Sequence, residues 1–189
     1  HDTVRRQRQM CIRDSSTSSS TITSSAAVNL RLKSVDGGTA AAPILDFIRN
    51  SASPADNDSL GQIRFKGEDS ASNETTYSRI ISQVTDVTDG SEDSSLSFTS
   101  RVGGTQRTRL SLVSGEVVIN DESIDSDFRV ESNGNANMLF VDGGNNRVGI
   151  GTGSPSTLLH LSAANDPIIT LTDTGFGASA DITGSNGNL

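Results

Sequence analysis

Hydrophobic residues in this chain occur mostly as pairs at positions i and i+2. Such side chains share one face of an extended backbone, so the pattern predicts half-buried β-strands. Between residues 28 and 120 the pairs are Leu30/Leu32, Leu45/Phe47, Ile63/Phe65, Leu96/Phe98, Leu110/Leu112 and Val117/Ile119. The segments between them contain turn formers, namely Asp36-Gly37-Gly38, the run at residues 53–58, Asp89-Gly90, Gly103-Gly104 and Ser114-Gly115.

Two segments of this region allow a more specific prediction. Residues 110–119 (LSLVSGEVVI) predict a tight β-hairpin around Ser114-Gly115. Residues 73–87 have a spacing that is also compatible with a helix, but many of them are β-branched. Because β-branched side chains favour extended backbone, we predict a strand there too.

After residue 121 the apolar positions recur about every ten to twelve residues, a spacing typical of sandwiches, barrels or stacked repeats. They are Phe128/Val130, Leu139/Val141, Val148/Ile150, Leu159/Leu161, Ile169/Leu171 and Ile182. The most regular stretch is residues 145–161 (NNRVGIGTGSPSTLLHL), in which two strand signals flank a Gly/Ser/Pro turn.

A longer self-similarity suggests two copies of one module. Leu30-Arg31-Leu32 is followed by PILDF at residues 43–47, and Leu159-His160-Leu161 is followed by PIITL at residues 167–171. The spacers differ in length. We expect the second copy to be cut off at Leu189.

These patterns predict four segments along the chain. Residues 28–120 form a β-rich module and residues 121–189 form a repetitive β shaft that is truncated at the C-terminus. Residues 15–27 are rich in Ser and Thr and form a linker, because such a tract cannot bury enough apolar surface to order itself.

Residues 1–14 (HDTVRRQRQMCIRD) differ in composition from everything that follows. They hold four of the fifteen Lys and Arg residues and the single cysteine, Cys11. One interpretation is a basic arm for an anionic partner. We favour another, in which QMCIRD is the translation of a sequencing-library adapter joined to a metagenomic fragment, so that the segment is not native.

The amount of hydrophobic material is small for the number of predicted strands. Leu, Ile, Val and Phe make up 44 of the 189 residues, there is no Trp, and Tyr77 is the single tyrosine. A lone copy would have difficulty covering its apolar faces and strand edges, whereas three parallel copies around one axis could cover both. We therefore predict an all-β chain: short antiparallel strands in a β-sandwich-like module, then a repetitive fibrous β region, completed by trimerisation.

Charge and hydropathy argue against several kinds of partner. The formal net charge is −8 and the isoelectric point is near 4.6, so we expect no nucleic-acid partner, because an acidic surface repels phosphate. No apolar run is long enough to span a bilayer, so we expect no membrane insertion. With one cysteine, the chain cannot form an internal disulfide.

No residue pattern predicts a catalytic, cofactor or metal site. Gly149, Gly151 and Gly153 alternate but do not open a helix, so a close approach of strands explains them better than a phosphate loop does. His160 lies between Leu159 and Leu161 and should point away from their face. Aromatic platforms for sugars are scarce, and we expect that the chain is not an enzyme.

Two acidic clusters contain carboxylates that could supply oxygen ligands to calcium. Neither has the spacing of a calcium-binding loop, so we expect solvated turns and no metal. The clusters are Asp86, Asp89, Glu92 and Asp93, and then Asp121, Glu122, Asp125, Asp127 and Glu131.

Residues 148–155 (VGIGTGSP), followed by Leu159-His160-Leu161, resemble the VGIGTxSP repeat of bacteriophage tail fibres. Residues 43–119 are similar to a module of marine phage tail fibres, and the two likenesses cover most of residues 28–189. The resemblance implies a homotrimeric shaft or intermediate domain in a virion, bound to other tail or baseplate proteins. The host receptor would be bound by a region outside this fragment.

The function expected from the sequence is therefore structural support of host attachment by a phage tail fibre. A bacterial surface adhesin or stalk with similar repeats is the alternative, and it would place the chain on a cell surface. A glycan-cleaving tailspike is the third possibility.

Overall fold

A computed structural model describes residues 21, 23, 25, 28–35, 37–39 and 43–170. The predicted adapter segment at residues 1–14, most of the predicted linker, Leu171 and Ile182 lie outside the described residues. The chain divides into two units, residues 1–47 and residues 48–189, and all the strands lie in the second.

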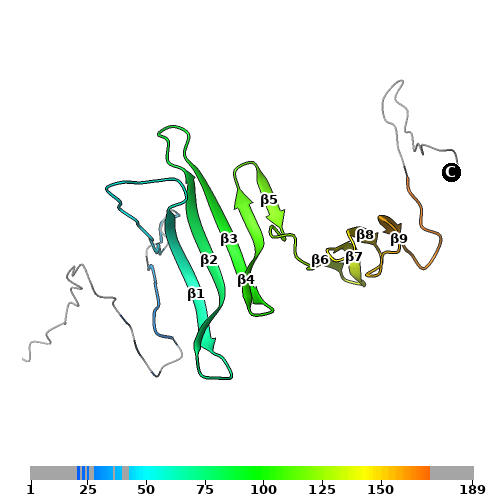
Figure 1. The fold of residues 1–189 in the computed structure, drawn as a ribbon, viewed down its shortest axis with the longest axis horizontal. Coiled ribbons are helices and arrows are strands. Elements are labelled where there is room, and N and C mark those ends of the chain that lie inside the picture. Colours follow the sequence, from blue (N-terminus) through cyan, green and yellow to red (C-terminus); the bar gives the residue numbers. More distant parts are fainter. Residues whose placement is uncertain are drawn as a thin grey trace, which may run out of the picture. The chain divides into compact units, whose positions relative to one another are not determined.

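The all-β class is confirmed, since the described residues form strands and irregular segments and no helix. Figure 1 shows the strands. They are β1 (Ser59–Glu68), β2 (Glu74–Asp86), β3 (Asp93–Val102), β4 (Thr105–Val113), β5 (Glu116–Ile119), β6 (Phe128–Ser132), β7 (Asn135–Asp142), β8 (Arg147–Ile150) and β9 (Leu159–Leu161).

The first sheet is an antiparallel meander in the order β1-β2-β3-β4-β5, drawn in Figure 1 as one open layer. The predicted hairpin at residues 110–119 is confirmed by the pairing of Val113 with Glu116. The β3–β4 turn consists of Gly103 and Gly104, whose φ angles are 54° and 81°. Two consecutive left-handed residues match the right-handed twist of the strands, and glycine adopts that conformation without steric cost.

Residues 73–87 form a strand, as their β-branched composition predicts. Strand β2 covers 13 residues of this segment and pairs with β1 on one side and β3 on the other. Pairing on both edges outweighs the helix-compatible spacing, because the backbone N–H and C=O groups at residues 78–83 find partners in both neighbouring strands.

The strands predicted at Leu30/Leu32 and Leu45/Phe47 are wrong. Ile169 also lies in irregular backbone, while Leu171, the other member of its predicted pair, falls outside the described residues. All five residues lie in irregular backbone and four of the five side chains are more than half exposed. Alternation within a few residues creates a strand only where a partner strand can pair with it. The structure therefore gives the two similar modules different local structures: Leu159–Leu161 is β9, while Leu30-Arg31-Leu32 is irregular.

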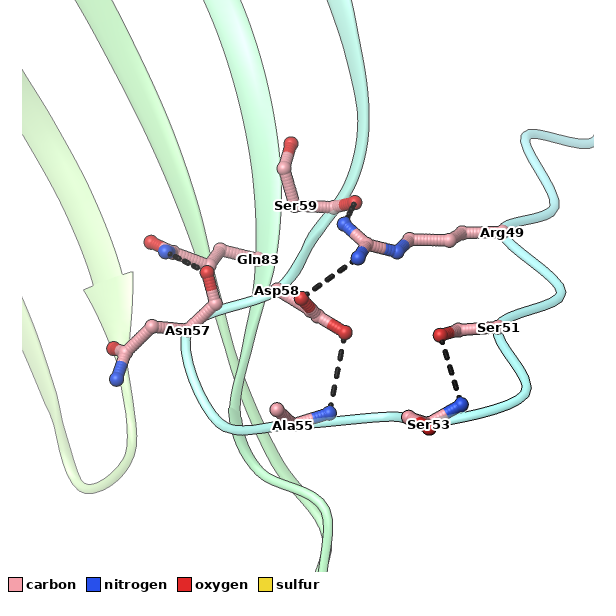
Figure 2. A network of polar contacts seen from close by, with 8 residues as sticks. All are labelled: Arg49, Ser51, Ser53, Ala55, Asn57, Asp58, Ser59 and Gln83. Carbon is pink, nitrogen blue, oxygen red and sulfur yellow. Dashed lines mark hydrogen bonds and ion pairs between the residues drawn. The ribbon is translucent and has the colours of Figure 1, made fainter.

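The segment before β1 is fixed to the first sheet by polar contacts (Figure 2). Arg49 forms an ion pair with Asp58 at 2.8 Å and donates a hydrogen bond to the Ser59 carbonyl at 3.2 Å. The Gln83 side-chain amide of β2 donates to the Asn57 carbonyl at 2.6 Å. Arg49 thereby occupies a carbonyl at the start of β1, the outer strand of the sheet, where free backbone groups otherwise invite pairing with another chain.

The second sheet has the order β6-β7-β8-β9, and its last pair departs from the antiparallel expectation. Strands β6, β7 and β8 are antiparallel neighbours, but β8 and β9 are parallel. The Gly/Ser/Pro segment between Ile150 and Leu159 is therefore not a hairpin turn but a crossing that returns the chain to the same end of the sheet.

This crossing lies over one face of the second sheet. The Arg147 guanidinium donates to the Pro155 carbonyl at 2.9 Å, and the Ser156 N–H donates to His160 Nδ1 at 3.2 Å. Pro155, Gly149 and Phe140 are buried. A Cβ at Gly149 would lie 2.4 Å from the Thr152 carbonyl oxygen, so the close approach here is of a loop to a strand rather than of two strands.

The contact at Gly149 predicts that the crossing needs glycine at this position. Gly149→Ala should displace Thr152 and cost about 1–3 kcal/mol, seen as faster hydrogen exchange in peptides from β8 and β9. Gly134→Ala is the matched control, because a Cβ there meets nothing within 4 Å and its φ is not in the left-handed region. Equal exchange rates in the two variants would contradict the proposed packing.

Candidate functional site: two apolar sheet faces

The first sheet has one face made largely of hydrophobic side chains. Residues paired across antiparallel strands share a face, and the register places Ile63, Ile80 and Phe98 in one row across β1, β2 and β3. Leu110 and Ile119 continue this row across β4 and β5. With the flanking positions, the first apolar face comprises Ile63, Phe65, Ile80, Leu96, Phe98, Leu110, Leu112, Val117 and Ile119.

The opposite face of the first sheet is mostly polar, although Ile81 and Val118 lie in the same row as Ser97 and Ser111. Its hydroxyl groups hydrogen-bond within the sheet. Ser111 and Thr99 are its two buried polar residues, exposed by 3% and 7%. The Ser97 and Ser111 hydroxyls lie 2.9 Å apart, and Thr99 donates to Gln106 Oε1 at 3.3 Å. Small hydroxyl side chains packed between neighbouring strands need no covering layer, because they hydrogen-bond within the sheet.

The second sheet also has a largely hydrophobic face, on which the alternation of β7 places Asn135 and Asn137 beyond Leu139. Phe128, Val141, Val148 and Leu159 form one row across β6 to β9, through the pairs 128–141, 141–148 and 148–159. The neighbouring row is built from the pairs Val130–Leu139 and Ile150–Leu161. The second apolar face is therefore Phe128, Val130, Leu139, Val141, Val148, Ile150, Leu159 and Leu161.

Both apolar faces are open to solvent in the single chain. Phe98 is 37% exposed, Ile119 43% and Leu159 54%. Among the described residues, Phe140 is the one large hydrophobic side chain that is buried, whereas 24 are exposed. Isolated exposed hydrophobic residues are ordinary, but contiguous rows of them mark interaction surfaces.

Three members of the first acidic cluster, Asp86, Glu92 and Asp93, line a shallow hollow of about 320 Å³ at the end of the first sheet. Its lining residues are Leu60, Val84, Asp86, Val87, Glu92, Asp93 and Ser94. Asp86 accepts the Thr88 N–H at 2.8 Å, and the Thr88 hydroxyl and N–H lower the pKa of Asp86 below its ordinary value. The Asp86 carboxylate therefore stabilises the turn that follows β2.

The second acidic cluster is distributed over separate local contacts. Glu122 pairs with Arg107 at 2.8 Å and accepts the Thr108 N–H at 2.8 Å. The Arg107 guanidinium and then the Thr108 N–H lower the pKa of the Glu122 carboxyl. Asp127 accepts the Gly143 N–H at 3.1 Å, and Glu131 pairs with Arg129.

No metal site emerges from the described part of the chain, where no group of three or more His, Cys, Asp or Glu side chains could hold an ion. His160 pairs with Gly149, so it lies on the face opposite Leu159 and Leu161, as the alternation predicts. Cys11 falls outside the described residues. The absence of a catalytic residue stays a prediction.

The i, i+2 pairs predicted from the sequence include every member of the two faces except Ile80, but they do not give the alignment of the strands. Each i, i+2 pair indicates a face within one strand, while the rows depend on register, which is set by turns and bulges. One such bulge lies between Phe98 and Thr99 and another between Phe65 and Lys66. The available signal was the Gly103-Gly104 turn, which fixes the register of β3 against β4.

Comparison with known proteins adds no assignment, because neither a protein-family model nor a curated protein matches this sequence. As for membranes, the described residues contain no helix with the length and apolar character needed to cross a bilayer.

The contacts of Glu122 predict a pH-dependent difference between variants. The folded-state pKa of Glu122 is lowered, so its carboxylate stabilises the fold above its unfolded pKa, and this stabilisation disappears as pH falls through the folded pKa. Glu122→Gln should therefore lower the urea midpoint at pH 7 and have little effect near pH 3.

Glu116→Gln is the control, because Glu116 is exposed and takes part in no ion pair of the described region. Protein concentration is held constant so that association does not shift the midpoint. A Glu122→Gln deficit that is equal at pH 7 and pH 3 would show that the carboxylate charge is not the cause.

Proposed function

We propose that this chain is a structural component of a phage tail fibre, a shaft or intermediate domain that supports host-receptor attachment as a homotrimer. The observation that carries the proposal is the pair of open apolar faces, each built from rows across several strands. Such faces suit a chain that folds fully only beside its copies, as fibrous proteins do.

The segment that resembles the tail-fibre repeat contributes to this function through the second sheet. Residues 148–155 supply β8 and the start of the crossing that closes one side of the second sheet. A repeat that closes one face and leaves the other apolar can be stacked many times along a shaft, because each unit offers neighbouring copies the same surface.

The proposed partners follow from the same reading. The homotrimer would attach to other tail or baseplate proteins of the virion, and host-receptor binding would belong to a region outside this fragment. A bacterial adhesin or stalk remains the alternative, since it could use the same sheets. Phage structural genes beside this gene would favour the first function, and a secretion signal or membrane anchor upstream would favour the second.

Association with virions is the direct test of this function. Antibodies raised against the full chain should detect it in density-purified phage particles from the culture that carries the gene, and gold-labelled antibodies should decorate their fibres in electron micrographs. An antigen found in the cell-envelope fraction and not on particles would contradict the proposal. Release of oligosaccharides from a host capsule by the purified chain would instead favour a tailspike enzyme.

A further inference from the structure

We propose that Asn133 is a site of spontaneous deamidation, at which the backbone of the chain itself converts the side-chain amide to a carboxylate. The site is the two-residue turn between β6 and β7, where Gly134 follows Asn133 and the flanking residues Ser132 and Asn135 are paired. The proposal concerns the chemistry of this turn and does not depend on the function proposed above.

The turn leaves both reacting groups accessible. Asn133 and Gly134 are exposed, and a Cβ added at Gly134 would meet nothing within 4 Å. Among the described residues, Asn133 is the one asparagine that is followed by glycine. Because glycine has no side chain, the Gly134 nitrogen is unshielded and can approach the side-chain carbonyl carbon of Asn133.

Hydrogen bonds hold the side chains of other turn asparagines, but not that of Asn133. The Asn145 amide donates to both carboxylate oxygens of Asp142, at 3.2 and 2.9 Å. The Asn73 amide donates to both oxygens of Asp69 in the same way. Within the described residues the Asn133 side chain has no such partner, so it is free to turn toward its own backbone.

The backbone of the turn is poorly matched to the strands that it joins. A two-residue β-hairpin turn fits the twist of its strands best when both turn residues have positive φ, and neither Asn133 nor Gly134 does. The pairing behind the turn is irregular too, because the register shifts between Val130 and Ser132. Such a hairpin end opens locally at low cost, and each opening allows the Gly134 nitrogen to rotate toward Asn133.

The reaction needs only water and hydroxide. The Gly134 nitrogen loses its proton to hydroxide and attacks Asn133 Cγ, while the bond from Cγ to the side-chain nitrogen breaks. That nitrogen takes up a proton from water and leaves as ammonia, so a succinimide ring remains. Water then opens the ring at one of its two carbonyls and gives aspartate or isoaspartate. The net change consumes one water molecule and releases one molecule of ammonia.

Isoaspartate at this position would loosen β6. It carries the main chain through the former side-chain carbon, which lengthens the turn by a methylene group and disturbs the pairing of Ser132 with Asn135. Strand β6 lies at the edge of the second sheet, and β7 is its single partner strand among the described residues. The change would therefore free β6, with Phe128 and Val130, while β7 keeps its pairing with β8.

Peptide mapping of the aged full chain tests the site. After incubation at about pH 8, the peptide that contains Asn133 should gain about 1 Da and accept label from an isoaspartyl methyltransferase, before the peptides with the other described asparagines do. Asn186-Gly187 is the other Asn-Gly pair of the sequence, lies outside the described residues and is followed in a separate peptide.

Gly134→Ala is the matched variant for the mechanism. The added Cβ has open space and the φ of Gly134 is not in the left-handed region, so the turn should keep its structure. The same Cβ would shield the attacking nitrogen and slow the mass gain at Asn133 by at least about tenfold.

Hydrogen exchange separates the effect of the lengthened main chain from that of the new charge. Asn133→Asp carries the charge of the deamidated chain on a normal main chain, so its β6 amides should exchange like those of the fresh parent. The β6 amides of the aged chain should exchange faster, and β2 peptides should stay unchanged in both samples.

No preferential mass gain at Asn133, or equal rates in the parent and in Gly134→Ala, overturns the proposal. Exchange in β6 that is as fast in Asn133→Asp as in the aged chain would overturn the assigned role of the lengthened main chain.

Discussion

A single β-sheet has two faces, and burial of the hydrophobic one is the constraint on which this structure depends. Hydrophobic burial supplies most of the free energy that offsets conformational entropy in a folded chain. In this chain the strands pair into two open sheets, yet Phe140 is the one large hydrophobic side chain buried within the described region. Strand pairing therefore forms both sheets, but most of their hydrophobic side chains have no second layer to pack against.

Each sheet closes one of its faces with its own residues and leaves its hydrophobic face uncovered. Polar faces are closed locally: Ser97, Ser111 and Thr99 bond within the first sheet, and the β8–β9 crossing covers the second. Apolar faces are left open in both. The described residues provide no second hydrophobic layer for these faces, and the proposed symmetric assembly of copies would supply one without any new sequence.

The sequence allows the strands and turns of residues 59–161 to be predicted, but not their arrangement. Ile63/Phe65 and Leu96/Phe98 alternate beside strong turn formers, so their strands are predictable. Leu30/Leu32 has the same alternation and forms no strand, because none of the strands in the described residues pairs with it. The parallel pairing of β8 with β9 depends on the path of the crossing, which the motif at residues 148–155 does not specify.

The mass of the full chain in solution tests the central claim most directly. The account predicts a sedimentation-equilibrium mass near three times the chain mass of 19.7 kDa, falling toward the single-chain value on dilution together with the loss of cooperative unfolding. A chain that stays at 19.7 kDa at all concentrations and still unfolds in one sharp, concentration-independent transition would contradict it, because its two sheets would then be stable with their apolar faces open.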